Sequence, residues 1–153
     1  MNNTEKQLNI AEIELSYKPK VKLSQQPKIR TSEDAYMIFL DTWDMDKIEF
    51  VEHFKIMLLT RSNSVLGIVT VSTGGVTGTV VDPRVIFSAA IKANACAIVL
   101  GHNHPSGNLK PSQPDIDLTS KIREGAKLFD IAVLDHVIVT KDGYLSFADD
   151  GIL

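Results

Sequence analysis

The chain has 153 residues, of which 44% are hydrophobic and 23% are charged, and these values are typical of one globular domain with a hydrophobic core of its own. Its 16 basic and 19 acidic residues give a net charge of −3, which provides no general electrostatic attraction to nucleic acid. It contains no apolar run long enough to span a bilayer and no signal-peptide pattern in its first thirty residues, so we expect a cytoplasmic protein with no membrane partner.

The first segment, residues 1–30, is predicted to be an N-terminal strand and a connector ahead of the main domain, residues 31–153. Apolar residues alternate between Leu8 and Tyr17, a pattern that favours a strand. Lysine and proline are frequent from there to Arg30, which is typical of a solvated connector. An arm that contacts substrate or phosphate is the less favoured interpretation of these basic residues.

Predicted helices and strands then alternate along the chain. The first helix has two acids in its first turn and an inward stripe that ends at Thr42, and the second has Asp82 as its cap, followed by proline. A polar turn at residues 61–64 joins two strands into an expected antiparallel hairpin. The predicted elements are a helix at 31–42, strands at 49–60, 65–72 and 79–81, and a helix at 82–94.

The second half continues the alternation. We expect a strand at 96–100, a helix at 113–129, a strand at 131–140 and a closing strand at 144–147 after a Lys-Asp-Gly turn. Cys96, the single cysteine, is predicted to be a small core residue in a reducing compartment. Strands that alternate with helices, with at least two hairpin connections, predict an α/β fold with a mixed β-sheet flanked by helices.

A chemically distinctive pattern, H-x-H-x7-S-x2-D, follows the strand predicted to end at residue 100. His102 and His104 are separated by one residue, and on an extended backbone that spacing directs both imidazoles to the same side. Asp115 stands at the start of the next predicted helix, three residues after Ser112. Imidazole and carboxylate suit zinc, and a catalytic zinc typically has three protein ligands and one water. The pattern therefore predicts a zinc site formed by His102, His104 and Asp115.

Some residues of this region allow a second interpretation. Ser112 and Asp115 also fit a capping box, in which an N-cap hydroxyl is followed by an acid three residues later, and both roles are compatible. Asp135 and His136 are neighbours on a predicted strand and should face opposite ways, although either one could support a metal ligand. A hydrolytic zinc site also needs a base for the proton of zinc-bound water, and a glutamate elsewhere in the chain is the natural candidate.

The strings HNHPSG and PSQPD resemble the JAB/MPN/JAMM metalloprotease motif in the wording of its RadC-like branch, a family labelled "DNA repair protein". The resemblance covers roughly residues 30–153 and continues through the strings Glu52-His53-Phe54, Asp82-Pro83-Arg84, Leu134-Asp135-His136 and Ser146-Phe147. It implies a cytidine-deaminase-like (JAB/MPN) fold. It further implies zinc on His102, His104 and Asp115, Glu52 as the general acid/base with Glu49 as its competitor, and Ser112 as a donor to the oxyanion.

The function implied by this resemblance is that of a zinc-dependent metallohydrolase, of metallopeptidase or isopeptidase type, with zinc-bound water as nucleophile and a protein or peptide as substrate. The alternative is a non-enzymatic DNA-repair or mobile-element-associated binding protein with a structural zinc. Family members often carry a helix-hairpin-helix segment ahead of the metal domain, and residues 1–30 are too few and too strand-like to form one. A nucleic-acid partner therefore depends on the family label alone. A nucleobase deaminase would need H-x-E and P-C-x-x-C, and the chain has neither string.

Overall fold

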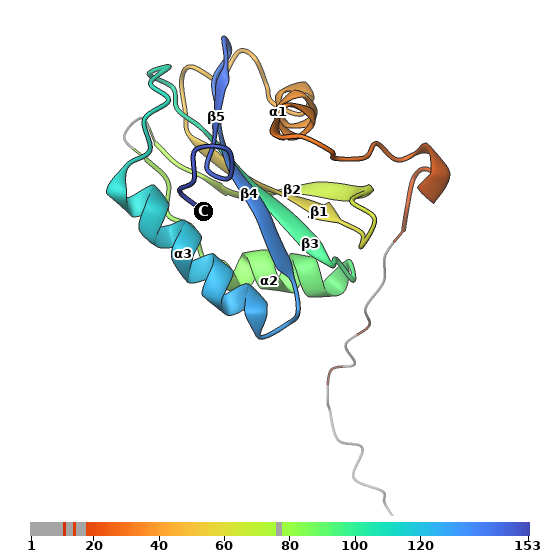
Figure 1. Ribbon diagram of the computed structural model, residues 1–153. Coiled ribbons are helices and arrows are strands. Elements are labelled where there is room, and N and C mark those ends of the chain that lie inside the picture. The colour runs from red at the N-terminus through yellow and green to blue at the C-terminus, as the bar shows by residue number, and fades with distance from the viewer. Residues whose placement is uncertain (1–10, 12–13, 15–17, 76–77) are drawn as a thin grey trace, which may run out of the picture.

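The computed structural model describes residues 11, 14, 18–75 and 78–153. The strand predicted between Leu8 and Tyr17 lies outside the described residues. The part that is described forms a five-stranded mixed sheet with three α-helices packed on it (Figure 1), which confirms the predicted α/β class.

The elements follow one another in the order expected from the sequence. They are the 3-10 helix η1 (Leu23–Gln25), helix α1 (Ser32–Asp41), strands β1 (His53–Leu59) and β2 (Val65–Thr73), helix α2 (Pro83–Lys92), strand β3 (Ala97–Asn103), helix α3 (Gln113–Lys127), and strands β4 (Ala132–Val139) and β5 (Tyr144–Ser146). The strand order across the sheet is β2-β1-β3-β4-β5. Strands β3 and β4 are parallel and are joined by a crossover through α3, and the other neighbouring strands are antiparallel.

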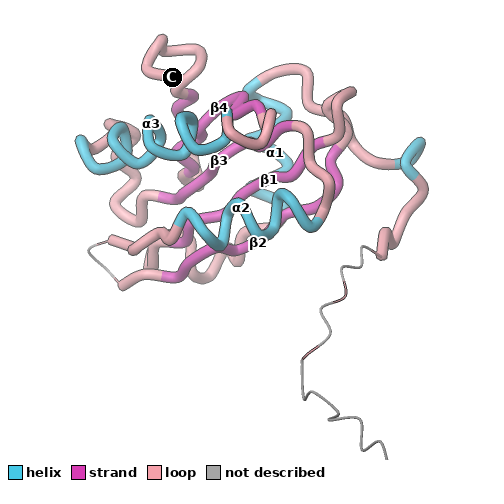
Figure 2. The backbone as a smooth tube through the Cα atoms, turned by 90° about the horizontal axis from the view of Figure 1, so that it is seen from below, coloured by secondary structure: helices cyan, strands magenta, loops and turns pink. Residues whose placement is uncertain are grey.

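Both faces of the sheet are covered, so the molecule has three layers and two hydrophobic clusters. Figures 1 and 2 show α1 on one face and α2 and α3 together on the other. Because successive side chains of a strand point to opposite faces, Met57 packs with Phe39 of α1, whereas Ile56 and Leu100 pack with Ile122 of α3. The central strand β3 is buried along its whole length.

Local sequence signals determine where the three α-helices begin. Helices α1 and α3 each start with a complete capping box, formed by Thr31 with Asp34 and by Ser112 with Asp115. Helix α2 starts after Asp82, whose side chain accepts a backbone N–H in the first turn, and has proline at its first position. Within the described ranges, no helix combines the length and the apolar character that crossing a bilayer would demand.

Three predicted strands were wrong in extent or existence. The strand expected at 96–100 continues to Asn103, so His102 lies within it. The strand expected at 49–60 begins only at His53, because the preceding residues form turns in which Ile48 and Val51 donate backbone N–H groups to carbonyls four residues earlier. Residues 79–81 form no strand. Thr79 is instead fixed by a hydrogen bond from its hydroxyl to Ser72 Oγ, 2.8 Å away.

Several residues expected in the core are exposed. The backbone of Cys96 joins the sheet by accepting from Ala132, but its side chain is exposed just before β3 begins. Thr42, the last residue of the predicted inward stripe, is exposed because α1 ends before it. Two apolar residues of the other predicted helices are exposed as well, because Val85 lies one position off the inward stripe of α2 and Phe129 follows the end of α3.

Candidate metal centre

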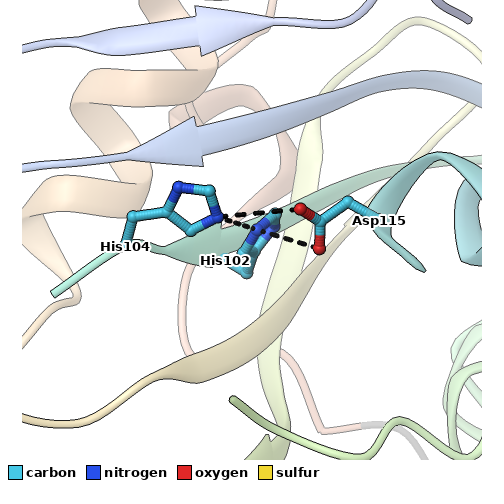
Figure 3. Close-up of side chains that lie close together, drawn as sticks. All are labelled: His102, His104 and Asp115. Carbon is cyan, nitrogen blue, oxygen red and sulfur yellow. Dashed lines mark hydrogen bonds and ion pairs between the residues drawn. The ribbon is translucent and has the colours of Figure 1, made fainter. Parts of the chain in front are cut away.

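Three side chains from two elements converge at one end of the sheet. His102 lies in β3, His104 follows directly after it, and Asp115 lies in the first turn of α3. One ligand atom from each lies within 4.8 Å of the other two (Figure 3). The Nε2 atoms of His102 and His104 are 2.9 Å apart, and the Asp115 carboxylate oxygens lie 3.4 Å from the first and 3.7 Å from the second.

The backbone explains why the two histidines face the same way. The N–H of His104 donates to the carbonyl of Val139 at 3.2 Å, so the chain stays extended and paired beside β4 for one residue beyond β3. On such a backbone His102 and His104 share a face, and the residue between them points to the opposite one. The side chain of His102 is 1% exposed, whereas those of His104 and Asp115 are 16% and 17% exposed. The cluster therefore has a buried floor and a side open to solvent.

The orientation of the His104 ring is fixed by the loop that follows. Its Nδ1 lies 2.5 Å from the carbonyl oxygen of Asn108, and because a carbonyl can only accept, Nδ1 carries the proton. The loop turns at Gly107, whose φ of +76° favours glycine. In the neutral ring the lone pair is then on Nε2, which faces His102 and Asp115 and is available to a metal.

The Asp115 carboxylate is oriented by the cap of its own helix. Its Oδ2 accepts both the backbone N–H and the hydroxyl of Ser112, each at 2.7 Å, so the capping interpretation of Ser112 is confirmed. Burial raises the pKa of Asp115, but the adjacent His102 and His104 rings and the hydrogen bond from Ser112 outweigh it and hold the pKa far below its usual range. Burial likewise lowers the pKa of His104, and the adjacent Asp115 and Asn108 carbonyl outweigh it and raise the pKa overall.

The donor set fits a divalent transition metal. Two imidazole nitrogens and one carboxylate oxygen, with one side open to solvent, are the ligands of a catalytic zinc. An anionic Asp115 facing two ring nitrogens is also the charge arrangement that a bound cation would stabilise.

Glu52 lies at the edge of this cluster, and Glu49 does not. The antiparallel register pairs Phe54 with His102, and its extension by two residues sets Glu52 opposite His104. Glu52 is half-buried, and burial raises its pKa although the charges of His102 and His104 partly oppose the shift. The Glu49 side chain is 64% exposed and lies 4.0 Å from Lys141 Nζ.

Asn103, which the sequence reasoning did not single out, holds the segment around Glu52. Its side chain accepts from the N–H of His53 at 2.7 Å and donates to the carbonyls of Ile48 at 2.7 Å and Val51 at 2.9 Å. The residue between the two histidines thus fixes the backbone on both sides of Glu52. The only signal in the sequence was an amide residue between two candidate ligands.

Asp135 and His136 face opposite ways, as predicted for neighbours on a strand. Asp135 accepts from the Ser146 hydroxyl at 2.6 Å and from the N–H of Ala148 at 2.9 Å, and so holds the C-terminal turn. His136 Nε2 lies 2.7 Å from His102 Nδ1, and its Nδ1 lies 2.6 Å from Thr119 Oγ1. The sequence analysis did not single out Thr119, which lies with Ile122 and Ala126 in the buried, mostly apolar stripe of α3. A hydroxyl within that stripe, one turn after Asp115, is the feature that marks it.

The chain is similar to a known domain family and to several named proteins. The RadC-like JAB domain family matches residues 29–152. A UPF0758 protein of Flavobacterium johnsoniae is 36% identical over 144 residues, which cover 94% of this chain and 62% of the relative. UPF0758 proteins of Desulfitobacterium hafniense and Rubrobacter xylanophilus are 45% and 43% identical over 102 residues, which cover 67% of this chain and 45% and 44% of those relatives. The chain therefore matches between 44% and 62% of the length of these three proteins.

The family match spans the whole described sheet and all three members of the metal-ligand cluster. It confirms the resemblance carried by the strings HNHPSG and PSQPD, and the mixed sheet with its three α-helices agrees with the JAB/MPN fold. The chain belongs to the RadC-like JAB domain family.

Proposed function

We propose that this protein is a zinc-dependent metallohydrolase that cleaves an amide or isopeptide bond in a protein or peptide. The observation that carries the proposal is that ligand atoms of His102, His104 and Asp115 lie within 4.8 Å of one another. His102 is buried, and His104 and Asp115 are partly open to solvent. These three residues would hold the metal. When bound, zinc polarises the scissile carbonyl and lowers the pKa of a water molecule.

Glu52 is the general base and then the general acid. Burial raises the pKa of this carboxylate, which makes it a stronger base than an exposed glutamate. It takes a proton from the attacking water and passes that proton to the leaving amine. Asn103 supports this role because it fixes the backbone on either side of Glu52.

Ser112 donates to the developing oxyanion. Its hydroxyl, which is exposed, donates to Asp115 Oδ2 when no substrate is bound, and its backbone N–H donates to the same oxygen. The hydroxyl can therefore turn to substrate while the N–H keeps Asp115 in place. The N-terminus of α3 adds a positive partial charge beside the same atom.

The composition of the cluster favours catalysis over a structural zinc. A structural zinc site is closed by four protein ligands, whereas a catalytic site keeps one position open. Among the residues the structure describes, three side chains make up this cluster. The net charge of −3 gives no support to a binding protein that holds DNA through its phosphates.

The test compares the wild type with Glu52→Gln, in zinc-loaded form, on a library of fluorescence-quenched peptides and isopeptide-linked peptides. We expect the substitution to lower the hydrolysis rate by about 10²- to 10⁴-fold, because the proton carrier is lost, and to leave the zinc content unchanged. Glu49→Gln is the matched control and should retain both rate and zinc, since Glu49 is exposed and pairs with Lys141.

Loss of zinc in Glu52→Gln would make Glu52 a ligand rather than the base, and full activity in that variant would remove it from the mechanism. If the zinc-loaded wild type cleaves no member of the library, the hydrolase proposal fails and the structural-zinc alternative takes its place.

A further inference from the structure

A buried chain of hydrogen bonds connects two of the metal-ligand residues behind the site. It runs from His102 Nδ1 to His136 Nε2 at 2.7 Å, from His136 Nδ1 to Thr119 Oγ1 at 2.6 Å, and from Thr119 Oγ1 to the Asp115 carbonyl at 2.6 Å. His102, His136 and Thr119 are 1%, 0% and 2% exposed. The chain therefore joins β3, β4 and α3 without contact with solvent.

The direction of each hydrogen bond in this chain follows from the hydroxyl proton of Thr119. The Asp115 carbonyl can only accept, so the single hydroxyl proton of Thr119 is donated to it. Thr119 Oγ1 then has only lone pairs left for His136, and His136 Nδ1 must carry a proton and donate it. The tautomer of His136 is thereby fixed by a hydroxyl on α3.

The second half of the chain follows from the surroundings of His136. Its ring is fully buried and packs against the rings of Phe147 and Phe54, with centroids 4.6 and 5.5 Å away, and such apolar surroundings favour the neutral imidazole over the charged one. In the neutral ring with a proton on Nδ1, Nε2 accepts, so His102 Nδ1 donates. The lone pair of His102 is then on Nε2, the atom that faces His104 and Asp115.

We infer that His136 and Thr119 are positioning residues, which fix the metal-binding tautomer of His102 and tie its ring to the backbone of Asp115. The inference rests on the proposed metal site and adds two residues to it. Neither residue is within the H-x-H-x7-S-x2-D pattern. Their effect is on the affinity for metal, because they preset two of the three ligands before the metal arrives, and partners of this kind change metal affinity by about 10- to 100-fold.

The experiment compares two substitutions of Thr119, one that removes its hydroxyl and one that removes its methyl group. Thr119→Val keeps the shape and removes the hydroxyl, whereas Thr119→Ser keeps the hydroxyl and removes a methyl group. The probe is Zn²⁺ alone, titrated against a chromophoric chelator. We expect Thr119→Val to weaken zinc binding by about 10- to 100-fold and Thr119→Ser to restore an affinity close to that of the wild type.

A second readout follows the histidine tautomers in the metal-free protein by nitrogen-15 NMR. Wild type and Thr119→Ser should show His102 and His136 each as the single Nδ1–H tautomer, and Thr119→Val should show a mixture. His136→Phe retains an aromatic ring in the same space without its nitrogens, and should weaken zinc binding as Thr119→Val does.

Equal zinc affinity in wild type and Thr119→Val, equal losses in Thr119→Val and Thr119→Ser, or an Nε2–H tautomer of His102 in the wild type would each overturn the inference. These outcomes are separate from failure of the proposed function. If the wild type binds zinc but cleaves no substrate, the hydrolase proposal is wrong, and the zinc affinities of the Thr119 variants still decide whether Thr119 positions the ligands. A wild type that does not bind zinc would sink the metal site, and the tautomers of the metal-free protein would still decide how the chain is arranged.

Discussion

Ser112 has two proposed roles, because the acid of its capping box is also a candidate metal ligand. Its Oγ accepts the N–H of Asp115, as in any capping box, while its N–H and O–H both donate to Asp115 Oδ2. Helix α1 begins with the same arrangement, in which Thr31 Oγ1 accepts from Asp34 and the Asp34 carboxylate accepts from Thr31. Asp34 belongs to α1, which lies on the opposite face of the sheet from α3 (Figures 1 and 2), so the first box provides a control for the second.

We predict that Ser112→Ala and Thr31→Ala each lower the free energy of unfolding of the metal-free protein by about 1 kcal/mol, the usual cost of a lost N-cap. Only Ser112→Ala should also weaken zinc binding, because it removes a hydrogen bond that orients Asp115. Denaturant unfolding and zinc titration of both variants measure the two effects. Unchanged zinc affinity in Ser112→Ala would show that the hydroxyl of Ser112 does not orient Asp115 and that the backbone N–H of residue 112 is enough.

At the residue scale, the sequence predicted the roles that depend on neighbours along the chain. The spacing of His102 and His104 and the capping box at Ser112 are local patterns, and both could be recognised directly. Glu52 immediately precedes β1 and His136 lies in β4, and only the register of the sheet brings them to His102. Their roles could not be derived from spacing, and Glu52 was named through family resemblance alone.

At the scale of elements, the fit between α1 and the central strand depends on one glycine. A Cβ atom added to Gly101 in β3 would lie 2.8 Å from Cε2 and Cζ of Phe39. Phe39 is fully buried in the α1-side core, so its ring has little room to move. The small residue next to His102 therefore allows α1 to pack directly on β3.

Gly101→Ala should destabilise the fold by about 1 to 3 kcal/mol through this overpacking. Gly67→Ala is the matched control within the same sheet, because a Cβ at Gly67 in the edge strand β2 meets no atom within 4 Å. Thermal unfolding of the two variants beside the wild type gives the comparison. If both alanines cost the same, close packing at Phe39 does not limit the fold.

Hydrophobic periodicity predicted the individual elements but not how they are arranged in the sheet. Hydrophobic spacing and caps predicted α1, α2, α3 and both hairpins, because these depend on short-range signals. The order β2-β1-β3-β4-β5 and the turns that delay β1 until His53 depend on contacts between distant segments. One such contact is the Asn103 amide, which binds the carbonyls of Ile48 and Val51, and nothing in the sequence of residues 44–53 indicates it.

At the scale of the whole molecule, the sheet gathers the site from segments that are far apart in the sequence. The start of β1, the end of β3 and the start of α3 meet at one end of the domain (Figure 1). Strand β4 supplies His136, whose ring nitrogen contacts that of His102. The two hydrophobic clusters on either face of β3 hold these segments in register. The proposed activity therefore depends on the assembled domain, and its central element is a metal held by His102, His104 and Asp115.

Metal analysis tests that central claim most directly. Wild-type protein and His104→Ala, both purified without chelator, are compared by elemental analysis, with circular dichroism to show that both are folded. We predict about one zinc per chain in the wild type and a large loss in the variant, because a catalytic zinc relies on three protein ligands. Wild-type protein that is folded and holds no metal, or a variant that holds as much zinc as the wild type, would contradict the account.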